Sequence, residues 1–349
     1  MARSGRGDFV IDGERVPAGS RRSLLLPLPA LSTFTSMALP VHVVHGRREG
    51  PVLFVSAAIH GDEINGVEII RRLIAHRALK NLAGTLILIP IVNVYGFVTH
   101  SRYLPDRRDL NRSFPGSPHG SLAARLAHAF VDKIVSKASH GIDLHTGGIN
   151  RFNHPHIRAR LADPETLALA RAFGAPIVID ANLRDGSLRQ YAADAGIRML
   201  LFEAGEALRF DELAIRAGVA GVINVMVALG MISPRYRHRA AEPVIARRSQ
   251  WVRAPQSGIL RMFARVADPV EKGGVLGVIA DPFGANAAEV RAPAKGLIAG
   301  RTQLPVVNEG DALFHVAELE DVEQAVSETE AFLTNLEGLG PGDYPLEPV

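Results

Sequence analysis

The chain has 349 residues, of which 47% are hydrophobic and 21% are charged, and it contains no cysteine. This length exceeds what one hydrophobic core usually fills, so we expect one large domain and one smaller one. The lack of cysteine excludes disulfides, thiolate metal ligands and a cysteine nucleophile. A net charge of +3 without a basic block argues against nucleic-acid binding. The N-terminus lacks the apolar core of a signal peptide and no apolar stretch is long enough to span a bilayer, so we expect a cytoplasmic protein with no membrane partner.

Apolar segments that alternate with amphipathic ones indicate an α/β fold for a first domain of residues 1–240. Residues 1–45 are rich in β-formers and turn residues, with an edge segment at 24–29. The pattern predicts strands at 52–58, 86–92, 141–144, 176–179 and 199–202, and helices at 63–79, 122–135, 164–173, 187–195 and 210–229. Short apolar strands between helices predict a mixed, largely parallel sheet with helices on both faces.

The sequence repeats itself after residue 240. Residues 252–260 (VRAPQSGIL) return as residues 290–298 (VRAPAKGLI), each followed by a glycine-marked turn and a short apolar strand. The duplication predicts a small all-β module over residues 241–320, similar to the barrel-sandwich fold of biotinyl and lipoyl carrier domains. The hairpin between the halves, residues 280–289, has no lysine to modify, which argues against a carrier role. We expect the tail, residues 321–349, to be loosely ordered.

Metal-ligand side chains follow or end three of the predicted strands. Residues 60–63 (HGDE) follow the first, residues 143–145 (DLH) end another, and Glu203 closes a third. Because ligands bind beyond the carboxyl ends of strands in open α/β sheets, we expect these side chains to converge. Two imidazoles and one carboxylate, here His60, His145 and Glu63, are the ligand set of a hydrolytic zinc centre with an open position for water.

Some of these residues also have a purely structural interpretation. His60 and Glu63 would suit the start of a helix, where the imidazole caps and the carboxylate complements the dipole. Asp143 lies on the same strand face as His145, and it either orients that imidazole or is a buried, hydrogen-bonded carboxylate. Gly61 is expected to let the backbone leave the strand in a tight turn.

Glu203 is the candidate general base. It ends the apolar run 199–202, where a carboxylate is costly unless it is paired or functional. A carboxylate there is placed to take the proton of a metal-bound water. We prefer it to Glu206, which we expect to be exposed. The histidines of residues 153–156 (NHPH) follow the His145 loop and could line the pocket, but loop histidines more often lie at the surface, which is what we expect here. They are not proposed as ligands.

Residues 109–112 (DLNR), after the second strand, are candidates for substrate binding. The planar guanidinium of Arg112 can donate two hydrogen bonds to a carboxylate, and the side-chain amide of Asn111 adds a neutral donor and acceptor beside it. A solvated loop arginine is the alternative interpretation of Arg112. Arg102 is a weaker candidate of the same kind.

Taken in order, residues 60–63, 109–112, 143–146 and 203–205 resemble the succinylglutamate desuccinylase/aspartoacylase family, a branch of the zinc carboxypeptidase-like hydrolases. The resemblance spans residues 50 to 320. It implies one zinc ion held by His60, Glu63 and His145. It also implies that Arg112 and Asn111 hold the substrate or stabilise the oxyanion, and that Glu203 is the general base and acid in cleavage of an N-acyl amino acid.

The chain departs from the family pattern in two places. Where aspartoacylase-like enzymes carry an arginine that grips the substrate carboxylate, this chain has Ala193, with Arg189 and Arg198 as nearby substitutes. The C-terminal tyrosine of those enzymes has no match. We therefore expect a small anionic N-acyl amino acid or peptide-like substrate whose acyl group and amino acid stay open. The oligomeric state is open too, a homo-oligomer included.

Three other functions fit parts of the pattern. A zinc carboxypeptidase acting on small peptides would use the same residues. Non-haem iron oxygenases also use two histidines and a carboxylate, although such sites usually occupy β-barrels. A non-catalytic metal-containing binding protein would keep the fold and recognise a partner through the C-terminal module. A ligand set together with a base favours a metal-dependent hydrolase.

Overall fold

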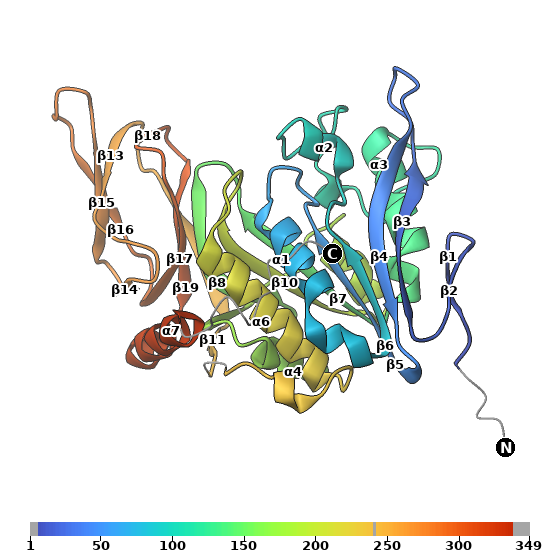
Figure 1. Cartoon of the computed structure of the whole chain (residues 1–349). Coiled ribbons are helices and arrows are strands. Elements are labelled where there is room, and N and C mark those ends of the chain that lie inside the picture. Colours follow the sequence, from blue (N-terminus) through green and yellow to red (C-terminus); the bar gives the residue numbers. More distant parts are fainter. Residues whose placement is uncertain (1–5, 240–241, 338–349) are drawn as a thin grey trace.

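The computed structural model describes residues 6–239 and 242–337. Its largest element is a mixed sheet of the strands β3 (Ser20–Leu28), β4 (Met37–His45), β5 (Arg48–Ala57), β6 (Ala83–Ile89), β7 (His140–Gly147), β8 (Arg151–Ala159), β9 (Ile177–Asp180), β10 (Arg198–Glu206), β11 (Val244–Ala246), β12 (Arg248–Arg253), β14 (Pro269–Val270), β17 (Gly296–Thr302) and β19 (Ala312–Glu318). Figure 1 shows the N-terminal strands, in blue, at one end of this sheet and the C-terminal strands, in orange and red, at the other.

The strand order is β12-β19-β17-β8-β10-β7-β5-β6-β4-β3. The four central strands β10, β7, β5 and β6 run parallel, whereas the strands outside them pair mostly antiparallel. The predicted mixed sheet is confirmed, but "largely parallel" holds only for its centre. The reason is that the β3–β4 hairpin and the C-terminal strands extend the sheet by antiparallel pairing. As expected, the edge segment 24–29 falls mostly in the edge strand β3.

Helices cover both faces of the sheet. On one face, α1 (Asn65–Ala75), α4 (Pro164–Phe173) and α6 (Glu212–Ala228) share a buried apolar cluster with the central strands. On the other face, α2 (Val94–Val98), α3 (Leu122–Lys133) and α5 (Leu188–Asp194) pack with the β1 (Phe9–Ile11) and β2 (Glu14–Val16) hairpin. Short 3₁₀ turns complete the chain: η1 (Arg77–Asn81), η2 (Leu110–Arg112), η3 (Val135–Lys137) and η4 (Pro234–Tyr236). Most of the predicted helices and strands therefore exist close to their expected bounds.

Strand β8 lies where we expected surface histidines, and that expectation was wrong. β8 is inserted between β10 and β17, and His154 and His156 are 5% and 1% exposed. The sequence of β8 contains no apolar run that would predict a strand. Its residues are buried because the strand pairs with segments distant in the sequence. Pro155 is tolerated because it lies opposite the irregularity of β10 between Glu203 and Gly205.

The sequence repeat joins the large sheet to a small one. The small sheet contains β13 (Gly258–Met262), β15 (Val275–Ala280), β16 (Ala288–Arg291) and β18 (Val306–Val307). The first copy leads from β12 to β13 and the second from β16 back to β17, and apolar residues of both copies share one core. The large sheet continues across the predicted boundary at residue 240, because β11 pairs with β9. The division at residues 240 and 320 stays a prediction.

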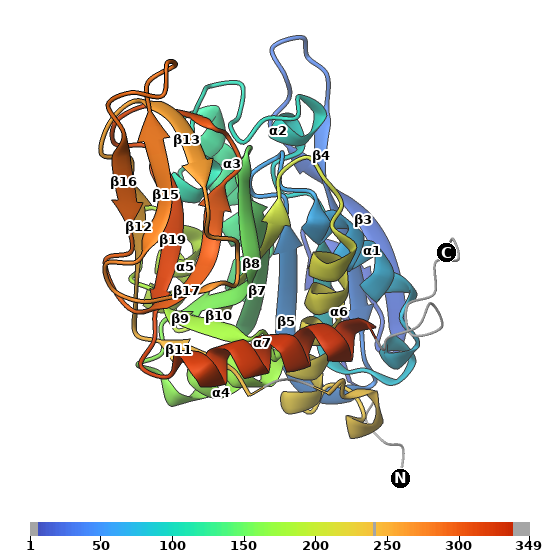
Figure 2. The ribbon, with the colours of Figure 1, turned by 90° about the vertical axis from the view of Figure 1, so that its left-hand side faces the viewer.

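Helix α7 (Val322–Glu337) occupies most of the segment that we expected to be loosely ordered. That expectation was wrong for these residues, because Val322, Ala325, Phe332 and Leu336 recur at helical spacing and are buried. Figure 2 shows α7 lying across the molecule beside β11 and α6. The glycine- and proline-rich residues 338–349 lie outside the described residues. Within the described ranges, no helix is both long and apolar enough to cross a membrane.

An ion-pair network joins α1 to α6. Arg72 donates to both carboxylate oxygens of Glu212, at 2.9 and 2.8 Å, and to Glu68 at 2.8 Å. The hydrogen bond from Arg72 lowers the pKa of Glu212 to about 2.

We expect Glu212→Gln to lower the free energy of unfolding by about 1 kcal/mol at neutral pH, because half of the Glu212 side chain is exposed and water weakens the pair. Since the folded pKa is depressed, this stabilisation is complete above pH 4.5 and is lost as the pH falls toward 2. Denaturant unfolding of both proteins at neutral pH and in acid checks this. Glu320→Gln, an exposed carboxylate, is the control. A difference that grows on acidification would contradict the prediction.

Candidate metal centre and active-site pocket

His60, Glu63 and His145 are brought together by the neighbouring parallel strands β5 and β7. His60 lies in the loop after β5, Glu63 precedes α1, and His145 lies near the end of β7. Glu63 lies between the two imidazoles, with Oε1 2.7 Å from His60 Nδ1 and Oε2 2.8 Å from His145 Nδ1. One ligand atom from each side chain lies within 4.8 Å of the other two, and all three side chains are buried.

Each imidazole has a second carboxylate behind it. His145 Nε2 donates to Asp143 at 2.7 Å, and Asp143 also accepts from Ser56 Oγ at 2.7 Å. His60 Nε2 lies 3.3 Å from Asp109 Oδ1. Carboxylates in this position fix the orientation of a metal-binding histidine and raise its basicity. Asp143 therefore contacts His145 as one of our two interpretations required, whereas the contact of Asp109 was missed.

The charges of this cluster suit a divalent cation. Burial alone would raise the pKa of Glu63, but the two histidines hold it well below its usual value. Burial alone would lower the pKa of His60 and His145, but the carboxylates around them raise both. Imidazole nitrogens and carboxylate oxygens are donors that zinc prefers. A cation would replace the protons that the imidazoles hold in its absence.

Gly61 lies in the expected turn, in which the Glu63 amide donates to the His60 carbonyl at 3.1 Å, but the turn does not require the backbone freedom of glycine. Its φ is not positive. A Cβ at this position would lie 2.1 Å from the carbonyl carbon of Gly96 and 2.2 Å from the amide nitrogen of Phe97, both in α2. The close approach of two backbone segments therefore excludes a side chain at position 61.

Glu203 faces the same cavity from β10. The strand registers place it beside His145 of β7 on one side and His156 of β8 on the other. Asn153 donates to Glu203 Oε2 at 2.9 Å, and burial raises the pKa of the carboxyl group. A carboxyl group with a raised pKa can exchange a proton closer to neutral pH. Glu206 instead accepts from the Asn150 amide and does not line this cavity.

The cavity has a volume of about 160 Å³. It is lined by all four residues predicted to bind substrate: Arg102, Asn111, Arg112 and Arg189. Among the other lining residues are three arginines and two aromatic residues that sequence reasoning did not assign to the cavity: Arg151, Arg158, Arg184, Trp251 and His315. Trp251 and His315 come from the C-terminal strands β12 and β19, and their rings stack with centroids 5.0 Å apart. No motif marks these five positions.

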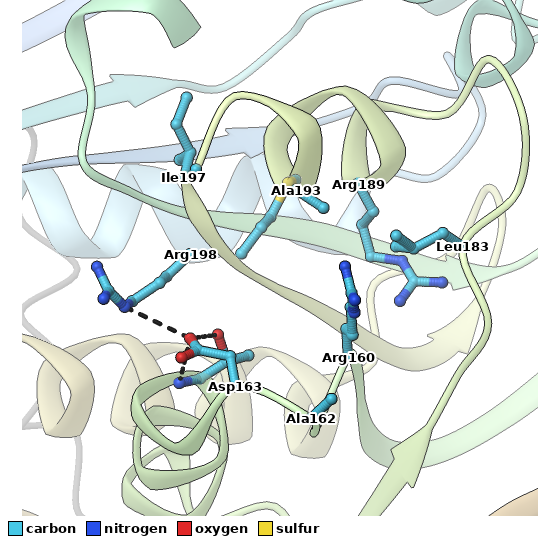
Figure 3. A pocket seen from close by; sticks show the side chains of 11 residues that line it. Arg160, Ala162, Asp163, Leu183, Arg189, Ala193, Ile197 and Arg198 are labelled. Atoms are coloured by element: carbon cyan, nitrogen blue, oxygen red, sulfur yellow. Dashed lines mark hydrogen bonds and ion pairs between the residues drawn. The ribbon is translucent and has the colours of Figure 1, made fainter.

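A larger cavity of about 380 Å³ shares Arg189 with the first (Figure 3). It contains Ala193 and Arg198, the other two positions considered for gripping a substrate carboxylate. Arg198 points toward Asp163 and forms its shortest ion pair, at 2.6 Å, with Glu165. Of these three positions only Arg189 lines the cavity with the histidines.

Comparison with known proteins identifies the class. Residues 49–229 match the model of the succinylglutamate desuccinylase/aspartoacylase catalytic domain, and the chain belongs to this family. It is 28% identical over 302 residues to an N-alpha-acetyl-L-2,4-diaminobutyric acid deacetylase of Halomonas elongata, which covers 82% of this chain and 88% of that protein. The family resemblance is thus confirmed, and it is a family of deacylases.

Solved structures share the fold. A succinylglutamate desuccinylase/aspartoacylase of Rhodobacter sphaeroides superposes with a TM-score of 0.77 and 28% identity, covering 86% of this chain and 96% of that one. The product-bound ectoine utilization protein EutE of Ruegeria pomeroyi gives a TM-score of 0.78 at 24% identity, covering 85% and 95%. The second likeness concerns the fold alone.

We expect Gly61→Ala to destabilise the protein by about 1–3 kcal/mol, as overpacking does, and to weaken zinc binding by displacing His60 and Glu63. Gly7→Ala, where a Cβ would meet nothing within 4 Å, is the matched control. Denaturant unfolding and zinc content after dialysis measure the two effects. Wild-type stability together with wild-type zinc content would show that the loop tolerates a side chain.

Proposed function

We propose that the protein is a zinc-dependent deacylase that hydrolyses the amide bond of a small N-acyl amino acid. The observation that carries the proposal is that Glu203, with its raised pKa, lines the same cavity as His60, Glu63 and His145. In this proposal the latter three hold one zinc ion per chain. When bound, zinc supplies a water of lowered pKa and polarises the acyl carbonyl.

The remaining roles follow from the side chains of the cavity. Glu203, held by Asn153, takes the proton from the water and returns it to the departing amine. Arg112 binds the substrate carboxylate or the oxygen that gains charge. Asn111 Oδ1 accepts from the Leu188 amide at 2.9 Å, so it ties the loop of Arg112 to α5. Arg102 contacts both Asp109 and Glu63, and it holds these carboxylates while lining the cavity.

The small cavity supports a small substrate over a longer peptide, since pockets for larger ligands are usually about 300–1,000 Å³. Trp251 and His315, which belong to the C-terminal strands, line this cavity. We therefore assign the barrel-sandwich-like module, residues 241–320, to shaping the pocket.

Glu203→Gln keeps the shape of the side chain and removes its charge. We expect kcat to fall at least about 100-fold, the usual contribution of a general base, with zinc content and thermal stability retained. The assay is release of free amine from a panel of N-acyl amino acids by the zinc-loaded protein. Glu206→Gln is the control and keeps near-wild-type turnover. Near-normal turnover of Glu203→Gln would rule out the role of this carboxylate.

Removal of the metal by a chelator should abolish turnover, and one equivalent of zinc per chain should restore it.

Because the pKa values of His60 and His145 are raised, protons compete more strongly with the metal as the pH falls, so we expect zinc to be lost on acidification. Elemental analysis after dialysis at several pH values measures this. Iron accompanied by consumption of 2-oxoglutarate would favour an oxygenase. Bound zinc without hydrolysis of any substrate in the panel would favour a binding protein.

A further inference from the structure

His156 is a buried residue of the cavity to which the proposed function gives no role. It lies in β8, where only 1% of its surface is exposed, and it lines the cavity together with Glu203. It does not belong to the cluster of His60, Glu63 and His145. Because a buried polar side chain needs hydrogen-bond partners, the two ring nitrogens of His156 decide what this residue can bind.

One ring nitrogen of His156 is bound to the protein. Nδ1 lies 2.7 Å from the carbonyl oxygen of His154. A carbonyl oxygen only accepts, so Nδ1 carries a proton and donates it. Burial lowers the pKa of His156 well below its usual value, so the imidazole is neutral at neutral pH. A neutral imidazole with its proton on Nδ1 has a free lone pair on Nε2, which can therefore only accept.

The acceptor Nε2 of His156 is unused and its ring is held in place. Nε2 makes no hydrogen bond with any residue in the described ranges. The bond of Nδ1 fixes the ring from one side, and the ring of His315 meets it edge to face, with centroids 6.1 Å apart. An oriented acceptor in a cavity suits a ligand that donates a hydrogen bond.

His145, Glu203 and His156 form one row across three neighbouring strands. Glu203 of β10 pairs with His145 of β7 on one side and with His156 of β8 on the other. Paired residues of neighbouring strands share a face of the sheet. Since the strands lie about 5 Å apart, the row is roughly 10 Å wide. The proposed base therefore lies between an imidazole of the proposed zinc site and the unused acceptor.

The substrate of the proposed function carries a donor at the bond that is cleaved, the amide N–H. A secondary amide is planar and trans, so its carbonyl oxygen and its N–H point in opposite directions. With the carbonyl toward the proposed zinc site, the N–H points away from it, toward His156. The arginines of the cavity have no acceptor atom for this N–H. Glu203 holds the proton of the water when the nitrogen leaves, so at that step it is a donor.

We propose that Nε2 of His156 accepts a hydrogen bond from the N–H of the amide that is cleaved and makes the site selective for secondary amides. The inference rests on the proposed deacylase function and adds a residue that contacts the reacting bond. The contact holds the leaving nitrogen beside Glu203, which gives it a proton. Esters have no N–H and do not make this contact.

The test compares an amide with its ester on the zinc-loaded protein. The amide is the best substrate of the N-acyl amino acid panel, and in the ester an oxygen replaces its N–H. We expect His156→Leu, which has no acceptor, to lower kcat/KM about tenfold for the amide and less than about twofold for the ester, because only the amide loses a hydrogen bond. His156→Gln, whose side-chain oxygen can accept, should keep the wild-type ratio of amide to ester.

His154→Leu is the matched control, because His154 is buried in the same strand but is not among the residues that line the cavity. It should keep the wild-type ratio. If His156 only supported β8 or Glu203, its loss would lower kcat/KM for the amide and the ester alike. An equal loss for both substrates in His156→Leu, or no loss for either, would overturn the proposal.

A second measurement does not depend on how well His156→Leu folds. Phosphonamidate and phosphonate analogues of the substrate differ only in an N–H that becomes an oxygen. We expect the nitrogen-15 resonance of Nε2 of His156, identified by its loss in His156→Gln, to shift when the wild-type protein binds the phosphonamidate and not when it binds the phosphonate.

The same resonance position with both inhibitors would also overturn the contact. Each of these contrary results would leave the deacylase function standing, since the amide would still be hydrolysed. Failure of the zinc-loaded wild-type protein to hydrolyse any amide of the panel would overturn the proposed function and the contact together.

Discussion

The site depends on one buried carboxylate held between two imidazoles. Glu63 contacts His60 and His145 through different oxygens, and each imidazole has a further carboxylate behind it. Such a cluster needs neighbouring parallel strands, because only then do the ends of β5 and β7 meet at one edge. A one-residue slip between these strands would turn one imidazole to the opposite face. The apolar central strands, covered by helices on both faces, prevent that slip.

Charge separates the cavity into two parts. The histidine cluster is surrounded by carboxylates, which favours a cation, whereas Arg158 and Arg184 leave the remaining wall positive. In the proposed function, the amide carbonyl of the substrate would thus lie toward the histidine cluster and its carboxylate toward the arginines. Trp251 and His315, which come from the C-terminal strands, line the same cavity.

The parts of this site that a sequence predicts are those that follow apolar strands. His60, His145 and Glu203 each follow or end an apolar run, so the rule on strand ends was enough to bring them to one cavity. Arg158 was not predictable, because β8 has no apolar periodicity and becomes a strand only through pairing with β10 and β17. Trp251 and His315 reach the cavity because the large sheet continues into the C-terminal strands. The local sequence around these two residues does not predict a contact with such distant segments.

The most direct measurement is anomalous diffraction at the zinc edge from crystals of the zinc-loaded protein. We expect a single anomalous peak per chain, within coordination distance of His60, Glu63 and His145, with Glu203 facing it across the cavity. A peak held by other residues, or no peak at this position in protein that contains stoichiometric zinc, would contradict the proposed metal centre.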